Sequence, residues 1–256
     1  MRLLVFLALL FVVPMSSAYA ASANRGGSGS ENEDGVSLTD QEINRWSVIS
    51  KDFSPSYEAM VMDLRSGKKD MRLGVSALRT YYPYTRSYTP FSDKIIDEMV
   101  GYAYIVDTSD DNVAVNRALA NYRDLLNKHM ANLGVVSYAL TLSRLDVRFG
   151  DDLFLRKIRD TIRNSWSGRG NIGSEPQHPY KVVTFAEEEY ILSTYGGEVV
   201  KSDIYKVSKQ FFDVRDVVDD NGDYIQIYFD VSVPIRNVAM IKAVREKEQK
   251  TVIPLQ

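Results

Sequence analysis

Residues 181–203, KVVTFAEEEYILSTYGGEVVKSD, mark the point where helical periodicity gives way to strand periodicity. Val182–Phe185 predicts a short buried strand, and Glu187–Tyr195 predicts a helix that Gly196-Gly197 ends. A strand that leads into a helix must bury one face of each. Because helical patterns precede this stretch and strand patterns follow it, we expect it to join the two layers of an α+β fold.

The first twenty residues, 1–20, have the layout of a cleavable secretory signal peptide. Arg2 precedes an apolar run at 3–13, and Ala18-Tyr19-Ala20 supplies the small-residue exit. We expect cleavage near Ala20, or three residues later at a second A-x-A, and a periplasmic or secreted product. The apolar run is too short to cross a bilayer, so no stable membrane span is expected after cleavage.

Composition excludes several classes of function. The chain has 256 residues, a net charge of −3, two histidines and no cysteine. The absence of cysteine excludes a lipid-anchored lipoprotein and disulfides, and the mild acidity argues against nucleic acid as a partner. With so few soft ligands, we expect no metal site, and no motif predicts a cofactor. Residues 21–36, rich in Gly, Ser and acidic side chains, predict a disordered linker.

Residues 37–167 predict an irregular stack of antiparallel helical hairpins, similar in architecture to tetratricopeptide arrays but without a clean 34-residue repeat. Thr39 and Glu42 form a capping box, so a helix should begin near Asp40. Ser54-Pro55 predicts a restart, with proline at the first position of a second helix. Further apolar stripes predict helices after Asp70, near 95–106, and at 113–130, 135–149 and 153–166.

An aromatic segment interrupts these helices at 79–91, RTYYPYTRSYTPF. Its two prolines predict an extended conformation over the helical surface. One function for the segment is a stacking platform for a sugar ring or a partner peptide, and the alternative is packing of the rings against the core. The candidate binding residues are Tyr81, Tyr82, Tyr84, Tyr88 and Phe91.

Residues 168–180 predict a loop, and 181–256 a small β-α-β-β unit packed on the helices. Strands are predicted at 204–218 and 224–233, joined by a hairpin turn at Asn221-Gly222. In the second strand the odd-numbered residues should face inward, which would place Phe229 in one core with Phe185 and Ile191. Residues 238–244 predict a final strand or a short helix.

Three segments resemble one bacterial family. Leu78–Phe91 is similar to an L-R-x-L-Y-Y-G-Y segment followed by Y-x-P-Y, with Pro83 in place of a glycine. Ile162–Gly170 leads into 181–183 in the manner of an I-x-x-S-G-D-G motif before a short strand, with Arg169 in place of the aspartate. Glu188–Leu192 and 227–231 are similar to E-E-Y-x-x-L and I-Y-F-D-V. In this order and spacing the chain resembles the family catalogued as domain of unknown function 4919.

The resemblance covers roughly residues 54–233. Members of that family are mostly secreted, and no activity is assigned to them. It therefore implies a secreted helix-plus-sheet protein and does not by itself imply a reaction.

Several local patterns match known sites incompletely. Gly168–Gly173 matches G-x-G-x-x-G, but a helix precedes it where a dinucleotide site requires a strand. Asp219–Asp223 begins like a calcium loop but lacks the glycine and glutamate that follow. Glu187–Glu189 is expected to complement a helix dipole. His178 has no partner spaced for catalysis, and His129 is expected to contact the last carbonyls of a helix.

Two hypotheses of function remain. The first is a non-catalytic module that binds a protein or glycan partner in the cell envelope. The second is an envelope-associated hydrolase that uses Glu and Asp carboxylates, in which two carboxyl groups should lie within about 5–10 Å in one cleft. No catalytic constellation is evident in the sequence, which favours the binding module.

Overall fold

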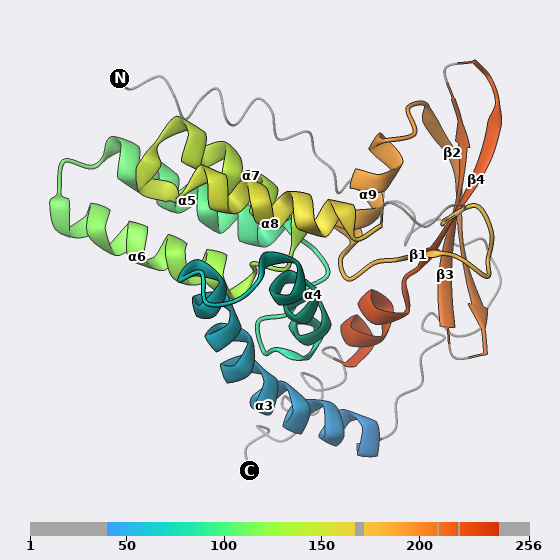
Figure 1. The fold of residues 1–256 in the computed structure, drawn as a ribbon, viewed down its shortest axis with the longest axis horizontal. Coiled ribbons are helices and arrows are strands. Elements are labelled where there is room, and N and C mark those ends of the chain that lie inside the picture. The colour runs from blue at the N-terminus through green and yellow to red at the C-terminus, as the bar shows by residue number, and fades with distance from the viewer. Residues whose placement is uncertain (1–39, 167–171, 209, 220, 241–256) are drawn as a thin grey trace, which may run out of the picture.

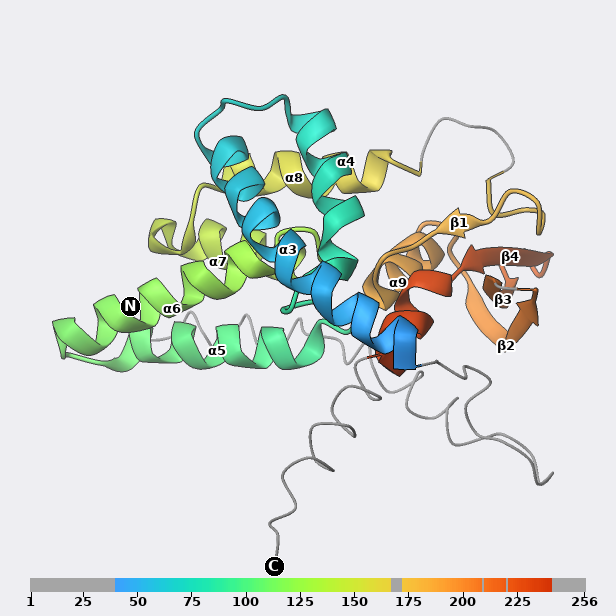
Figure 2. The ribbon, with the colours of Figure 1, turned by 90° about the horizontal axis from the view of Figure 1, so that it is seen from below.

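The protein combines a helical part and a small four-stranded sheet, as the α+β prediction requires. The structure is a computed structural model that describes residues 40–166, 172–208, 210–219 and 221–240, with side chains from residue 53 onward. The predicted signal peptide and linker lie outside these ranges. Figures 1 and 2 show the sheet at one end, helices α5 to α8 at the other, and α9 between them.

The helical part is built from hairpins of antiparallel neighbours. Its helices are α3 (Asp40–Arg65), α4 (Met71–Tyr81), α5 (Asp93–Thr108), α6 (Asn112–Lys128), α7 (Leu133–Leu145) and α8 (Asp152–Asn164), with short 3-10 turns at Tyr82–Tyr84 and Val147–Phe149. Most begin at an Asp or Asn side chain that accepts backbone N–H bonds at the N-cap, as Asp70 does from Leu73. Helix α5 packs on α6, and α7 on α8. The prediction of stacked helical hairpins is confirmed.

Two details of the helical prediction were wrong. Helix α3 runs through Pro55 without a restart, because the apolar stripe that follows the proline is buried and supports one continuous helix. The aromatic segment is not extended at its start: α4 continues to Tyr81, and Tyr82–Tyr84 forms a 3-10 turn with Pro83 in its first turn. Proline is accepted there because its fixed φ suits a helical first turn.

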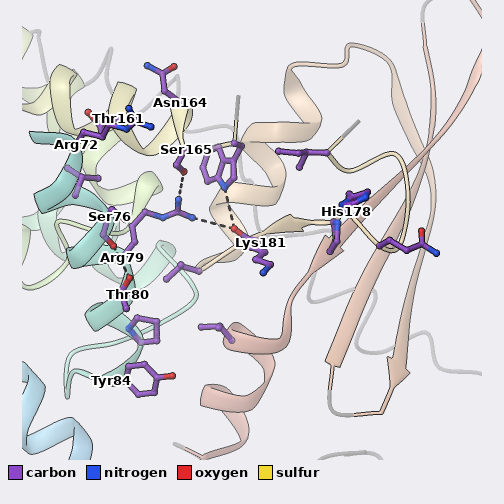
Figure 3. Close-up of a pocket in the computed structure, with 18 residues that line it drawn as sticks. Arg72, Ser76, Arg79, Thr80, Tyr84, Thr161, Asn164, Ser165, His178 and Lys181 are labelled. Atoms are coloured by element: carbon purple, nitrogen blue, oxygen red, sulfur yellow. Dashed lines mark hydrogen bonds between the residues drawn. The ribbon is translucent and has the colours of Figure 1, made fainter. Parts of the chain in front are cut away.

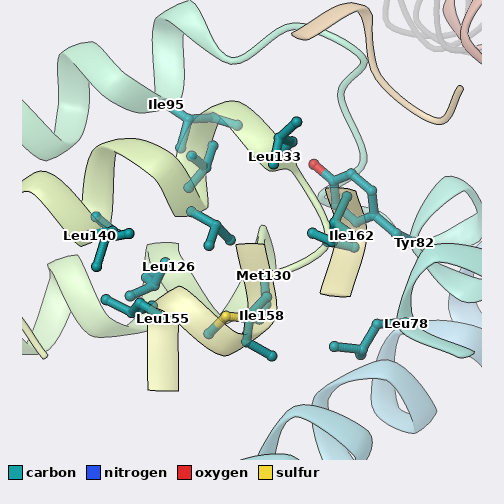
Figure 4. Close-up of a cluster of buried hydrophobic side chains, with 14 of the residues drawn as sticks. Leu78, Tyr82, Ile95, Leu126, Met130, Leu133, Leu140, Leu155, Ile158 and Ile162 are labelled. Atoms are coloured by element: carbon teal, nitrogen blue, oxygen red, sulfur yellow. The ribbon is translucent and has the colours of Figure 1, made fainter. Parts of the chain in front are cut away.

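One apolar core connects the helices. Figure 4 shows side chains from α4 to α8 meeting between the helices, with Tyr82, Leu126, Ile158 and Leu78 at most 1% exposed. The contacts come from successive i, i+3 and i+4 positions of each amphipathic helix. Gly134 lets the start of α7 approach Ser92 and α9 closely, since a Cβ there would lie 2.8 Å from that of Ser92 and 3.2 Å from that of Ala186.

The sheet has the strand order β1-β4-β3-β2. Its strands are β1 (Tyr180–Lys181), β2 (Glu198–Val207), β3 (Gln210–Val218) and β4 (Tyr224–Asp230). Strand β1 pairs with β4 in parallel, whereas β2–β3 and β3–β4 are antiparallel hairpins. The second hairpin turns at Asn221-Gly222 as predicted, with Asp219 accepting from the Asn221 and Asp223 backbone N–H groups. Residues 232–240 form a last helix, which excludes the alternative of a strand up to Met240.

The strand predicted at 182–185 was displaced. Strand β1 lies at Tyr180–Lys181, only the Val182 N–H continues the ladder to the Asp230 carbonyl, and Phe185 already begins α9 (Phe185–Ser193). The signal that was overlooked is a T-x-x-E sequence at 184–187, which is typical of a helix N-terminus.

The single strand predicted at 204–218 is two strands. The chain reverses after Ser208, whose φ of 56° lies in the left-handed region, and no glycine or asparagine marks that turn. The unit is therefore β-α-β-β-β, with β2 added at the outer edge of the sheet.

The predicted shared core exists, with Phe185 contributed by α9. Phe229, Phe185 and Ile191 all belong to the buried cluster, and Phe229 is fully buried whereas Tyr228 on the other face is only half-buried. Phe229→Ala should therefore lower the free energy of unfolding by about 3–5 kcal/mol, as buried Phe truncations do. Tyr228→Ala should cost far less. Thermal and urea unfolding of both variants checks this, and equal losses would mean that the wrong face of β4 had been assigned to the core.

Candidate functional site

A groove of about 1360 Å³ lies where the helical part meets the sheet. Its walls come from α4, from the end of α8, and from the 172–179 loop that leads into β1 (Figure 3). The loop is anchored by Gly173, whose N–H donates to the His178 carbonyl and whose carbonyl accepts from the Tyr228 N–H. Only glycine fits at 173, because φ is +85° and a Cβ would collide with the Tyr180 ring.

Arg79 lies at the floor of the groove and reaches across from α4. Its guanidinium makes an ion pair with Glu187 at 2.8 Å, donates to the Ser165 hydroxyl, and lies within 3.5 Å of the Lys181 carbonyl. The Trp166 ring covers it, with the guanidinium carbon 4.9 Å from the ring centre. Because the side chain is 12% exposed, this one residue joins α4, α8, β1 and α9 with little contact to solvent.

Glu187 is the buried partner of that arginine. Its Oε2 also accepts the Val183 backbone N–H at 2.8 Å, so the carboxylate holds both the start of α9 and the end of β1. Burial raises the pKa of Glu187, and Arg79 and the Val183 N–H oppose the rise. Glu187 therefore does more than complement a helix dipole: it joins two parts of the fold.

A second buried network lies beneath α9 on the sheet. The Arg215 guanidinium bridges Asp213 at 2.7 Å and Glu188 at 3.3 Å, and Ser202 donates to the other oxygen of Asp213. Burial, followed by the charge of Asp213, raises the pKa of Glu188 well above its usual range. Both carboxylates are fully buried and neither lines the groove. Glu188 and Asp213 therefore lie in the core and away from the groove.

The lining of the groove is cationic. Its charged members are Arg72, Arg79 and Lys181, with the His178 ring beside them, and none of its described lining residues is Asp or Glu. Arg72, Lys181 and His178 are exposed, while Arg79 is paired. Apolar surface from Val75, Pro83, Val183 and Val233 lies beside these charges. Such a surface favours a ligand that carries negative charge together with some apolar contact.

The structure separates the five aromatic candidates. Tyr82 and Tyr88 lie in the core, where their hydroxyls meet His129 Nδ1 at 2.7 Å and the Val183 carbonyl at 2.8 Å. Tyr81 packs on Phe53, and Phe91, although 42% exposed, lies against Phe185. Tyr84 alone of the five lines the groove. The segment therefore forms no continuous platform, and it mainly seals the junction of the helices with α9.

The structure describes some of the remaining local patterns. The His129 ring contacts Tyr82 and not the helix carbonyls as expected, because the ring is buried beneath the 3-10 turn. The Asp219 carboxylate is used by its own turn. Gly168–Asn171 lies outside the described ranges. No group of three or more His, Asp or Glu side chains within those ranges is placed to hold a metal ion.

Sequence reasoning overlooked the residues that build the groove floor. Arg79 and Glu187 are 108 positions apart, and neither lies in a motif that predicts the pair. Ser165 and Trp166 were placed at the end of a predicted helix and within the Ile162–Gly170 segment of the family resemblance, and not in a site. The available signal was Glu187 itself, as the fourth residue of T-x-x-E.

Comparisons with protein-family models, with curated proteins and with solved structures found no match to this chain. The resemblance to domain of unknown function 4919 therefore stays a prediction. Within the described residues no helix is both long enough and apolar enough to cross a membrane.

The Arg79–Glu187 pair gives a prediction for stability. Arg79→Leu should lower the free energy of unfolding by roughly 3–5 kcal/mol, because it leaves a buried carboxylate without its cation. The double variant Arg79→Leu/Glu187→Leu should recover much of that loss. Urea unfolding at pH 7 measures both. A double variant as unstable as the single one would show that Glu187 carries little charge in the folded protein.

His129 gives a prediction for pH dependence. Burial, and then the nearby Lys128, lower its pKa from 6.5 to about 4. As pH falls, His129 in the unfolded chain takes up a proton before His129 in the folded protein does. The free energy of unfolding is therefore highest, as far as His129 determines it, above pH 6.5, and it falls as the pH approaches 4. This loss of stability amounts to about 3 kcal/mol. Unfolding free energies between pH 4 and 7 should show this slope in the wild type and a smaller slope in His129→Gln. Equal slopes would contradict it.

Proposed function

We propose that this protein is a non-catalytic binding module of the cell envelope, periplasmic or secreted, whose groove binds an acidic peptide segment of a partner protein. The observation that carries the proposal is the cationic lining of the groove, in which Arg72 and Lys181 are exposed and the described lining residues include no carboxylate. An anionic ligand is attracted most strongly where several cations lie together in a cleft whose walls are partly apolar.

The shape of the groove supports a chain-like ligand. At about 1360 Å³ it is larger than the pockets of roughly 300–1,000 Å³ that enclose small molecules. Its lining combines apolar side chains such as Val183 and Val233 with hydroxyl and amide groups from Ser76, Thr80 and Gln177. A peptide offers backbone and side-chain partners for both kinds of surface.

The alternative of a hydrolase lacks a supporting contact. Glu187, which pairs with the groove residue Arg79, is bonded to Arg79 and to the Val183 N–H. The Glu188–Asp213 pair is shared with Arg215 in the core. Neither arrangement leaves a carboxyl group free to transfer a proton to a ligand in the groove. We therefore propose binding without catalysis.

The test uses Trp166, which lines the groove, as the reporter. A Trp46→Phe background makes it the sole tryptophan of the chain. A short oligoglutamate peptide should change its fluorescence on titration, and added salt should weaken binding because exposed charges are screened. Arg72→Glu and Lys181→Glu should each weaken binding about tenfold, equivalent to ~1.4 kcal/mol.

The matched control is Lys94→Glu, which reverses an exposed charge on α5 outside the groove lining. It changes the net charge equally and should leave the affinity unchanged. Equal losses in all three variants would show a general charge effect and contradict the groove. If an oligogalacturonate binds tightly and oligoglutamate does not bind, the proposed ligand is an acidic glycan and not a peptide.

A further inference from the structure

Strand β2 is an open edge of the sheet. It follows β3 at the end of the strand order, and no strand in the described part of the chain pairs with its other side. All ten of its residues are exposed or half-exposed, including Val200 at 53%, Ile204 at 47% and Tyr205 at 49%. Proteins usually protect such an edge, because its free N–H and C=O groups invite another strand.

We infer that two copies of this chain associate through β2, antiparallel and about a two-fold axis at Ser202, to form one continuous sheet. The argument is independent of the groove and rests on the order of side chains along the strand. Opposed residues of an antiparallel pair lie on the same face of the sheet, and residues on one face of a strand are two positions apart. If α9 of both copies lies on one face of the joined sheet, opposed residue numbers must therefore be both odd or both even. The two-fold axis then passes beside a residue that is opposite its own copy.

The register centred on Ser202 matches the strand to itself. It places Lys201 of each copy opposite Asp203 of the other, on the two sides of the axis. Within one chain Lys201 already contacts Asp203, so the four charges would alternate around the axis. The two adjacent registers instead place Lys201 against Lys201, or Asp203 against Asp203. Like charges directly opposed are destabilising, so the strand selects one of the three.

The backbone of β2 agrees with this register. Antiparallel ladders leave the N–H and C=O groups of every second residue facing the free edge. Pairing with β3 starts at Val207 opposite Gln210, beside the two-residue connection. Counted from there as far as the register shift at Val200, the residues that face the edge are the even-numbered ones, among them Ser202. The central pair of the dimer would therefore be a hydrogen-bonded pair.

The association should be weak. The register of β2 on β3 shifts between Val199 and Lys201, and such a bulge ends a regular ladder. Val200 is the residue that the bulge leaves without a partner on β3, so about three residues of each copy, 201–203, can pair in regular register, which buries less surface than a permanent dimer needs. We expect a reversible dimer that forms with rising concentration.

Charge reversal tests the register. Sedimentation equilibrium of the wild type should show a monomer–dimer equilibrium at concentrations up to about 1 mM, where an association of ~4 kcal/mol is half complete. Lys201→Asp should abolish it, since four negative charges would meet, and Asp203→Lys should do so with four positive ones. The exchange Lys201→Asp/Asp203→Lys should restore it. These side chains are exposed, so the monomer should keep its melting temperature.

A single introduced cysteine gives a second measurement. The chain has no cysteine, and opposed Cα atoms in a hydrogen-bonded pair lie about 5.5 Å apart, within the range that a disulfide spans. Ser202→Cys should therefore form a disulfide-linked dimer on mild oxidation. The control Ser193→Cys, exposed at the end of α9, should remain monomeric. A wild type that stays monomeric throughout the concentration range, or equal cross-linking of both cysteines, would overturn the inference.

Discussion

The buried ion pair between Arg79 and Glu187 is the contact on which the arrangement of the two parts depends. Glu187 is fully buried and Arg79 nearly so, and together they touch α4, α8, β1 and α9. A buried charge pair contributes little net stability, because the loss of hydration offsets the attraction. We expect its effect to be on specificity, because a helical part docked in any other position would leave a charge alone in the core, which costs several kcal/mol.

The groove is a consequence of that docking. Arg79 draws α4 and α8 toward β1, and Trp166 covers the guanidinium and donates its indole N–H to the same Lys181 carbonyl. The 172–179 loop, held on β4 through Gly173, closes the other side (Figure 3). The cations left at the rim have no carboxylate among the described lining residues to neutralise them. Structure and charge at this junction are thus set by the same few side chains.

The two buried networks also separate the roles of adjacent glutamates on α9. Glu187 faces the helical part and pairs with Arg79, while Glu188 faces the sheet and meets Arg215 beside Asp213. Successive residues of a helix point about 100° apart, so a short helix between two layers can place one acid in each. Helix α9 is therefore an electrostatic connector between the layers as well as an apolar one (Figure 1).

Local pattern alone determined the helices from α4 to α8, the Asn221-Gly222 hairpin and the inward face of β4. These features depend on amphipathic periodicity, N-caps and turn chemistry, which act over a few residues. The same reasoning misplaced β1, joined β2 to β3 and divided α3 at Pro55, because those boundaries are decided by packing and by a Ser208 turn without a glycine or asparagine. Local patterns could not predict the groove. Its floor residues, Arg79, Ser165, Lys181 and Glu187, come together only when α4, α8, β1 and α9 dock. The strength of the attraction between their charges also depends on burial, which only the tertiary structure creates.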